Sequence, residues 1–126
     1  MIETVEAHVS SGLGNLAQAR SLIAETVEGW HREHLVKLVV LVGHELVANA
    51  LRHGAAPVRM RILLRSESIV IEVRDSGPGI PQISEIDNAT STSGRGLQIV
   101  ASLSMRWGVR LGEESKTVWA EIPTTG

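Results

Sequence analysis

The sequence predicts an α+β fold, a two-layer α/β sandwich with helices on one face of a mixed, mostly antiparallel sheet. Three observations support this: a predicted helix over residues 31–54 that contains the aliphatic run LVKLVVLV, two pairs of alternating segments over residues 58–75 and 106–123, and a Gly-, Pro-, Ser- and Thr-rich loop over residues 77–95. Helical and strand periods in one chain favour helices packed on a sheet. With 126 residues, the chain is expected to form a single domain over residues 1–126.

The first half of the chain is predicted to begin with a short edge strand over residues 2–9. A helix over residues 15–30 follows, with apolar residues at helical spacing and with Asn15 or Ser11 available as its N-cap. The next helix, over residues 31–54, is apolar on most of its circumference, so it should be buried on more than one side. Gly54 is expected to end it.

The second half is predicted to supply most of the sheet. The alternating segments VRMRILL and SIVIEVRD are separated by a tight turn, which indicates an antiparallel hairpin. After the long loop, GLQIVASLSM is expected to form a short helix. The segments RWGVRLG and KTVWAEIP then predict a second hairpin.

Composition narrows the function classes. The formal net charge of −2, with Lys and Arg scattered along the chain, argues against a nucleic-acid binder. The absence of Cys removes a disulfide framework and any Cys-based zinc site. No N-terminal segment resembles a signal peptide, and the aliphatic run over residues 35–42 is too short to span a bilayer. We therefore expect a cytoplasmic domain that contacts neither nucleic acid nor membrane.

Three local features suggest a binding site, although each has an ordinary structural explanation. Glu45 and Asn49 lie one turn apart on a helix that is apolar on most of its circumference, where polar groups need partners. Asp75 ends a strand and opens the segment DSGPGIP, which is also common turn chemistry. The segment SGRGLQIV places a glycine-bracketed turn before a helix, an arrangement that can present N–H groups to phosphate.

Taken together and in order, these motifs resemble the ATP-binding domain of the GHKL, or Bergerat-fold, superfamily. Gyrase-type topoisomerases, Hsp90-type chaperones, histidine kinases and MutL-type proteins share that domain. Within the superfamily, ELVANALRHG, the short lid over about residues 81–95 and the ending TVWAEIP resemble the stand-alone anti-sigma-factor serine/threonine kinases. The resemblance covers roughly residues 3–122.

The resemblance implies ATP and Mg²⁺ as ligands and assigns a role to each motif residue. Asn49 would bind Mg²⁺ through its amide oxygen, and Glu45 would be the general base. Asp75 would accept a hydrogen bond from the exocyclic amine of adenine. The other ATP-binding residues implied are the loop residues Gly77, Gly79 and Ile80, the lid residues Gly94, Arg95, Gly96 and Leu97, and Thr117 near adenine.

Two histidines offer competing interpretations. His44 with Glu45 resembles the phosphoacceptor box of histidine kinases, but the tail that follows in that box is missing here. A zinc-protease motif is excluded because Ala48 stands where its second His should be. His53 is more simply explained as a side chain that complements the dipole at the helix C-terminus.

Two functional hypotheses remain open at this point. The first is a protein serine/threonine kinase and anti-sigma factor that phosphorylates an anti-anti-sigma partner of the STAS type and binds a sigma factor. The alternative is a nucleotide-gated binding module without significant turnover, whose lid selects partners. A histidine-kinase catalytic fragment is a third reading, but we expect no room for a phosphoacceptor segment. A homodimer is left open.

Overall fold

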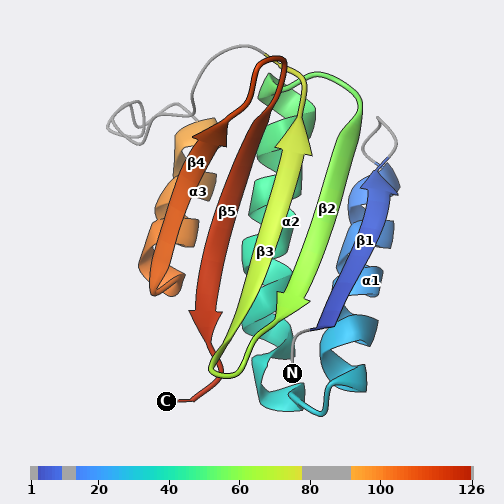
Figure 1. Ribbon diagram of the computed structural model, residues 1–126, viewed down its shortest axis with the longest axis vertical. Helices are drawn as coiled ribbons and strands as arrows, with labels where there is room; N and C mark the ends of the chain where they lie inside the picture. The colour runs from blue at the N-terminus through green and yellow to red at the C-terminus, as the bar shows by residue number, and fades with distance from the viewer. Residues whose placement is uncertain (1–2, 10–13, 78–91, 126) are drawn as a thin grey trace.

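The computed structural model describes residues 3–9, 14–77 and 92–125, and within α3 the side chains from residue 96 onward. The elements run in the order β1 (Glu3–Val9), α1 (Gly14–Gly29), the 3-10 turn η1 (Glu33–Leu35), α2 (Val36–His53), β2 (Val58–Leu64), β3 (Ser68–Asp75), α3 (Thr92–Leu103), β4 (Arg106–Leu111) and β5 (Lys116–Pro123). The strands form one sheet in the order β1-β2-β3-β5-β4 (Figure 1).

The layer arrangement predicted from the sequence is confirmed. The three α-helices lie behind the sheet in Figure 1, so that one face is covered and the other is open. All four strand pairings among the described residues are antiparallel, so the expectation of a mixed sheet is wrong in that detail. β1 is an edge strand, as predicted, and β4 forms the other edge.

Two helix boundaries differ from the prediction. The helix expected over residues 31–54 begins as α2 only at Val36, because His31 has a positive φ of 60° and the 3-10 turn η1 intervenes. Gly54 is the C-cap, as predicted, but its backbone is extended rather than left-handed. The third helix begins earlier than expected, at Thr92, and therefore includes the glycine-bracketed segment in its first turns.

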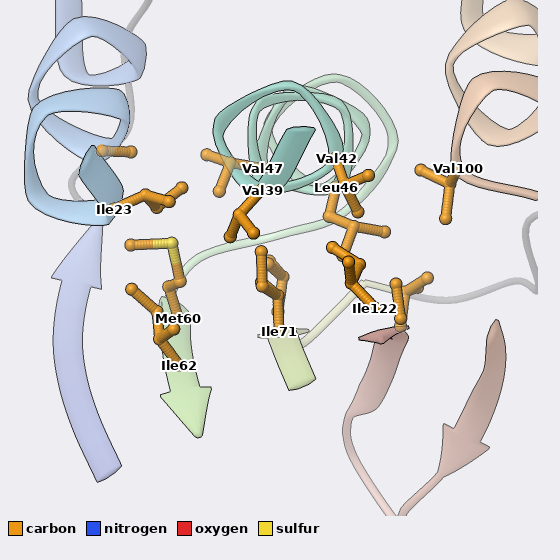
Figure 2. Packing of buried hydrophobic residues seen from close by; sticks show 14 of the residues in the cluster. Ile23, Val39, Val42, Leu46, Val47, Met60, Ile62, Ile71, Val100 and Ile122 are labelled. Atoms are coloured by element: carbon orange, nitrogen blue, oxygen red, sulfur yellow. The ribbon is translucent and has the colours of Figure 1, made fainter. Parts of the chain in front are cut away.

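The core lies between α2 and the middle strands. The side chains of Val39, Val42 and Leu46 on α2 point toward Ile71 on β3 and Ile122 on β5 (Figure 2), and all five are almost fully buried. Burying one such side chain contributes about 1.5–3 kcal/mol relative to leaving it exposed. This packing places the middle of α2 directly over the sheet.

The flanking helices extend the same core. Ile23 on α1 packs toward Met60 and Ile62 on β2, and Val100 on α3 lies on the other side of α2 (Figure 2). The helical stretch Glu33–His53 is long and apolar enough to cross a membrane, with 44% of its apolar window buried. Its central place between α1, α3 and the sheet accounts for that composition.

Candidate functional site

Asp75 is the most deeply buried charged group at the carboxyl end of β3, with an exposed fraction of 1%. Its Oδ1 atom accepts a hydrogen bond from the Gly77 N–H at 2.7 Å and lies 3.8 Å from Lys116 Nζ. Its Oδ2 atom is buried and has no hydrogen-bond partner among the described residues. An unsatisfied buried acceptor costs about 1–3 kcal/mol, which a ligand that donates a hydrogen bond would recover.

The backbone segments around Asp75 lie so close together that neither Gly54 nor Gly77 could carry a side chain. A Cβ atom added to Gly54, at the end of α2, would lie 2.4 Å from Asp75 Cγ. One added to Gly77 would lie 2.6 Å from Gly54 Cα, and the Ser76 N–H donates to the Ala55 carbonyl oxygen at 2.8 Å. Gly77 therefore lets the α2–β2 connection approach the end of β3, and its contact with ATP stays a prediction.

Glu45 and Asn49 occupy the part of α2 that faces α3. Asn49 is buried, with an exposed fraction of 8%, and Glu45 is half-buried one turn earlier. A Cβ atom added to Gly96 of α3 would lie 2.6 Å from Glu45 Oε2, so the missing side chain leaves room for this carboxylate. The structure thus brings together Gly96 and Glu45, two residues that the family resemblance assigns to one ATP site.

Leu97 does not have the position expected of a residue that closes over phosphates. Its side chain is 3% exposed and belongs to the hydrophobic core cluster. The physical reason is that α3 begins at Thr92, so Leu97 already lies in the body of the helix and faces the core. Its side chain fixes α3 to the core, and only its backbone remains available to the site.

The register between β3 and β5 places one predicted site residue, Thr117, away from Asp75. Asp75 pairs with Lys116, and Arg74 pairs with Thr117. Because side chains alternate along a strand, Lys116 shares the helix-covered face with Asp75, and Thr117 lies on the open face. The prediction that Thr117 contacts the base beside Asp75 does not fit this placement; Lys116, with an exposed fraction of 4%, stands there instead.

Sequence reasoning could have found Lys116 from a local signal. Val118, Ala120 and Ile122 are the apolar residues of β5 and are all buried. Counting back by two from them assigns Lys116 to the core face and Thr117 to the opposite face. Gly54 was recognised only as a helix stop, because its contact with Asp75 joins segments far apart in the sequence.

Several predicted residues cannot be placed. Gly79, Ile80 and most of the proposed lid lie outside the described residues. Gly94 and Arg95 belong to the first turns of α3, which fixes their backbone position only. These residues remain predictions.

The assignment of Asn49 as a Mg²⁺ ligand is compatible with its amide oxygen, but it provides one protein ligand only. No group of three His, Cys, Asp or Glu side chains that could hold a metal ion occurs within the described residues. Asn49 would supply a single oxygen ligand. That is enough for Mg²⁺, which is commonly held by one or two protein ligands together with phosphate oxygens and water. Asp75 fits the predicted adenine contact, because its Oδ2 atom has no donor among the residues that the structure describes.

The contacts of His44 and the position of His53 can be explained without a catalytic role. Nδ1 of His44 lies 3.0 Å from Arg20 Nη1 on α1, so this side chain turns toward α1, whereas Glu45 lies against α3. His53 is exposed in the last turn of α2, in agreement with a role at the helix C-terminus.

Residues 9–122 match the family described as the histidine kinase-like ATPase domain. Two curated proteins of Streptomyces coelicolor (strain ATCC BAA-471 / A3(2) / M145) are similar. The signal transduction histidine-protein kinase AfsQ2 is 54% identical over 37 residues, 29% of this chain and 7% of that protein. The sensor protein CseC is 38% identical over 77 residues, 52% of this chain and 14% of that protein. The chain thus matches only a small part of each relative's length.

Two solved structures share the fold. The histidine kinase domain from Erythrobacter litoralis EL346 blue-light activated histidine kinase has a TM-score of 0.57 and 21% identity, over 89% of this chain and 60% of that one. Acinetobacter baumannii histidine kinase AdeS has a TM-score of 0.56 and 15% identity, over 97% of this chain and 68% of that one. The match over residues 9–122 shows that the chain belongs to the histidine kinase-like ATPase domain family, whose ligand is ATP, typically with Mg²⁺.

Proposed function

We propose that this domain is the ATP-dependent catalytic unit of a protein serine/threonine kinase of the anti-sigma-factor type. The observation that carries the proposal is the position of Glu45, half-buried on α2, one turn from Asn49 and against Gly96 of α3. A carboxylate at this place can accept a proton near the end of the nucleotide that is remote from Asp75. Its role depends on what the acceptor group is.

The presence of a carboxylate base favours a hydroxyl acceptor. A Ser or Thr hydroxyl must lose its proton as the new P–O bond forms, and a positioned base accelerates this about 10²–10⁴-fold. A neutral imidazole attacks with a free lone pair and needs less help from a base. Glu45 therefore supports transfer to Ser or Thr over transfer to His.

The remaining residues bind and orient the nucleotide. Asp75 would accept the adenine amine through Oδ2, while its Oδ1 atom is held by the Gly77 N–H. Asn49 would supply an oxygen ligand to Mg²⁺, which when bound neutralises charge on the phosphates. The backbone at the start of α3 would lie near the phosphates, where the positive end of the helix dipole favours negative charge.

The proposed protein partners follow from the sequence resemblance. They are an anti-anti-sigma protein of the STAS type, as phosphoryl acceptor, and a sigma factor held by the same domain. The curated relatives are named as a histidine-protein kinase and a sensor protein, so transfer to a histidine is the outcome against which the proposal must be tested.

The decisive experiment is phosphoryl transfer from γ-labelled ATP to a STAS-type partner and to its variant with the acceptor Ser replaced by Ala. The proposal predicts label on the intact partner only, in an acid-stable linkage typical of phosphoserine. Acid-labile, base-stable label would indicate phosphohistidine and contradict it. ATP binding without any transfer would support the nucleotide-gated binding module instead.

Glu45→Gln tests the assigned base, because the amide keeps the shape and removes the proton acceptor. We expect transfer to slow by about 10²–10⁴-fold, with ATP affinity retained in calorimetry. Glu25→Gln, at an exposed position on α1, is the matched control and should change neither quantity. A Glu45→Gln variant that loses ATP affinity but transfers at the normal rate would show that the assignment is wrong.

A further inference from the structure

The open face of the sheet carries an arginine on each of several strands, and most of them are paired. Arg61 contacts Glu6 and Glu72, each at 3.2 Å. Arg110 contacts Glu72 at 2.7 Å, and Arg106 contacts Glu121 at 2.6 Å. These three guanidinium groups thus satisfy carboxylates that lie on the same face.

Arg59 and Arg74 differ from them. They are direct cross-strand partners in the β2–β3 pairing, and both are exposed. Neither has an ion pair or hydrogen bond within the part of the chain that the structure describes. Like charges directly opposite each other destabilise a sheet, so this pair brings no benefit to the fold by itself.

Both arginines line a groove of about 590 Å³ at the end of the sheet. The same groove is also lined by Ser76 after β3 and by Glu113, Glu114 and Ser115 of the β4–β5 turn. Because Arg74 and Asp75 are consecutive in β3, their side chains lie on opposite faces of the sheet. The groove is therefore distinct from the proposed adenine contact.

We propose that this groove binds an anionic side chain, a carboxylate or a phosphoryl group, on a segment of a partner protein. Arg59 and Arg74 would bind the anion with charge-assisted hydrogen bonds, for which guanidinium groups are well suited. Glu113 and Glu114 would contact a basic residue next to it in the same segment. The site goes beyond the proposed kinase function and does not depend on it.

The two glutamates in the groove favour a protein segment over a nucleic acid. A nucleic-acid strand carries successive phosphates, which would meet Glu113 and Glu114 as soon as one phosphate reached the arginines. A peptide can alternate acidic and basic side chains, so it can match both the arginines and the glutamates of the groove. Inorganic phosphate could contact the two arginines but would leave Glu113 and Glu114 without a cationic partner.

The proposal can be tested by backbone amide NMR titration of the full chain with three peptides, acetyl-Gly-Lys-Ala-X-Ala-Gly-amide. In these X is phosphoserine, Asp or Ser. We expect the phosphoserine or the Asp peptide to shift the amides of Arg59, Arg74 and Ser76, and the Ser peptide to leave them in place. Whichever acidic peptide binds more tightly identifies the phosphoryl or the carboxylate source.

Variants connect any shift to the two arginines. The double variant Arg59→Gln/Arg74→Gln should weaken peptide binding at least about tenfold. Arg65→Gln, which removes one exposed charge just beyond the opposite end of β2, should not. The idea is overturned if no acidic peptide shifts these amides, if inorganic phosphate binds as tightly as the peptides, or if oligothymidylate binds more tightly.

A stability measurement separates binding from a structural role. If the arginine pair is retained for a ligand, Arg74→Gln relieves like-charge repulsion and should raise Tm without ligand by about 1–4 °C. A lower Tm would show that Arg74 stabilises the sheet and would contradict the proposal.

Discussion

Asp75 and Glu121 are both carboxylates buried in the same sheet, yet their surroundings differ. Glu121 Oε2 accepts from Ser68 Oγ at 2.7 Å, and Oε1 accepts from the Arg106 guanidinium at 2.6 and 3.0 Å. Asp75 has one oxygen bound to the Gly77 N–H and one without a partner among the described residues. The fold supplies hydrogen-bond donors to both oxygens of Glu121, but the described residues supply a donor to only one oxygen of Asp75.

The difference separates a structural group from a binding group. Both oxygens of Glu121 accept hydrogen bonds from side chains on the open face of the sheet. The pKa of Glu121 is lowered from its ordinary value of 4.5, mainly by the Ser68 hydrogen bond and also by Arg106, while burial acts in the opposite direction. Glu72 is completed likewise by Arg61 and Arg110. Asp75 is the exception in this sheet, as expected where a ligand supplies the last hydrogen bond.

The largest expected effect tests this contrast directly. Asp75→Asn should weaken ATP binding by about 10³-fold and relax discrimination against GTP, because the amide can donate to the guanine carbonyl. Glu121→Gln should leave ATP affinity unchanged and lower only stability. Paired calorimetric titrations with ATP and GTP on the three proteins measure this. Equal ATP affinity in wild type and Asp75→Asn would remove Asp75 from base recognition.

The next effect concerns the cation beside Asp75. Lys116→Met keeps the chain length and leaves the buried Asp75 without its nearest positive charge, so we expect a loss of about 3 kcal/mol in the free energy of unfolding. Urea denaturation of the nucleotide-free protein measures it, with Lys37→Met at an exposed position of α2 as control. A variant as stable as wild type would show that the 3.8 Å contact contributes nothing.

A smaller, pH-dependent effect is expected for Ser68→Ala. Since the folded-state pKa of Glu121 is depressed, its stabilisation is present above the unfolded value near 4.5 and is lost as pH falls through the lowered folded value. Removing the Ser68 hydroxyl should cost about 1.5–3 kcal/mol at pH 7. The difference from wild type should narrow below about pH 4.5 in urea denaturation; a pH-independent difference would contradict this account.

The smallest effect is expected for Arg106→Gln. The side chain of Arg106 is 66% exposed, so solvent screens its ion pair with Glu121. We expect a loss below about 1 kcal/mol, which should shrink further at about 1 M NaCl. A loss as large as that of Ser68→Ala would mean that the arginine, and not the hydroxyl, completes Glu121.

Much of the fold could be predicted because its signals are local. The alternation in VRMRILL and SIVIEVRD and the aliphatic character of α2 reflect the contacts that each residue makes within its own element. That Glu45 and Asn49 share one face of a helix could also be predicted, because it follows from their spacing of four residues. Element boundaries were less accurate, because η1 and the start of α3 depend on packing against other segments.

The sequence by itself determined the two-layer arrangement, the family, and Asp75, Glu45 and Asn49 as candidates, since period and motif order are properties of the chain alone. Only the tertiary structure decided that Lys116 is the cross-strand partner of Asp75, and that Leu97 packs in the core. The register between β3 and β5 sets the first, and the docking of α3 sets the second. Both arise from contacts between distant segments, because alternation within β5 fixes the face on which Lys116 lies but not the residue that it pairs with.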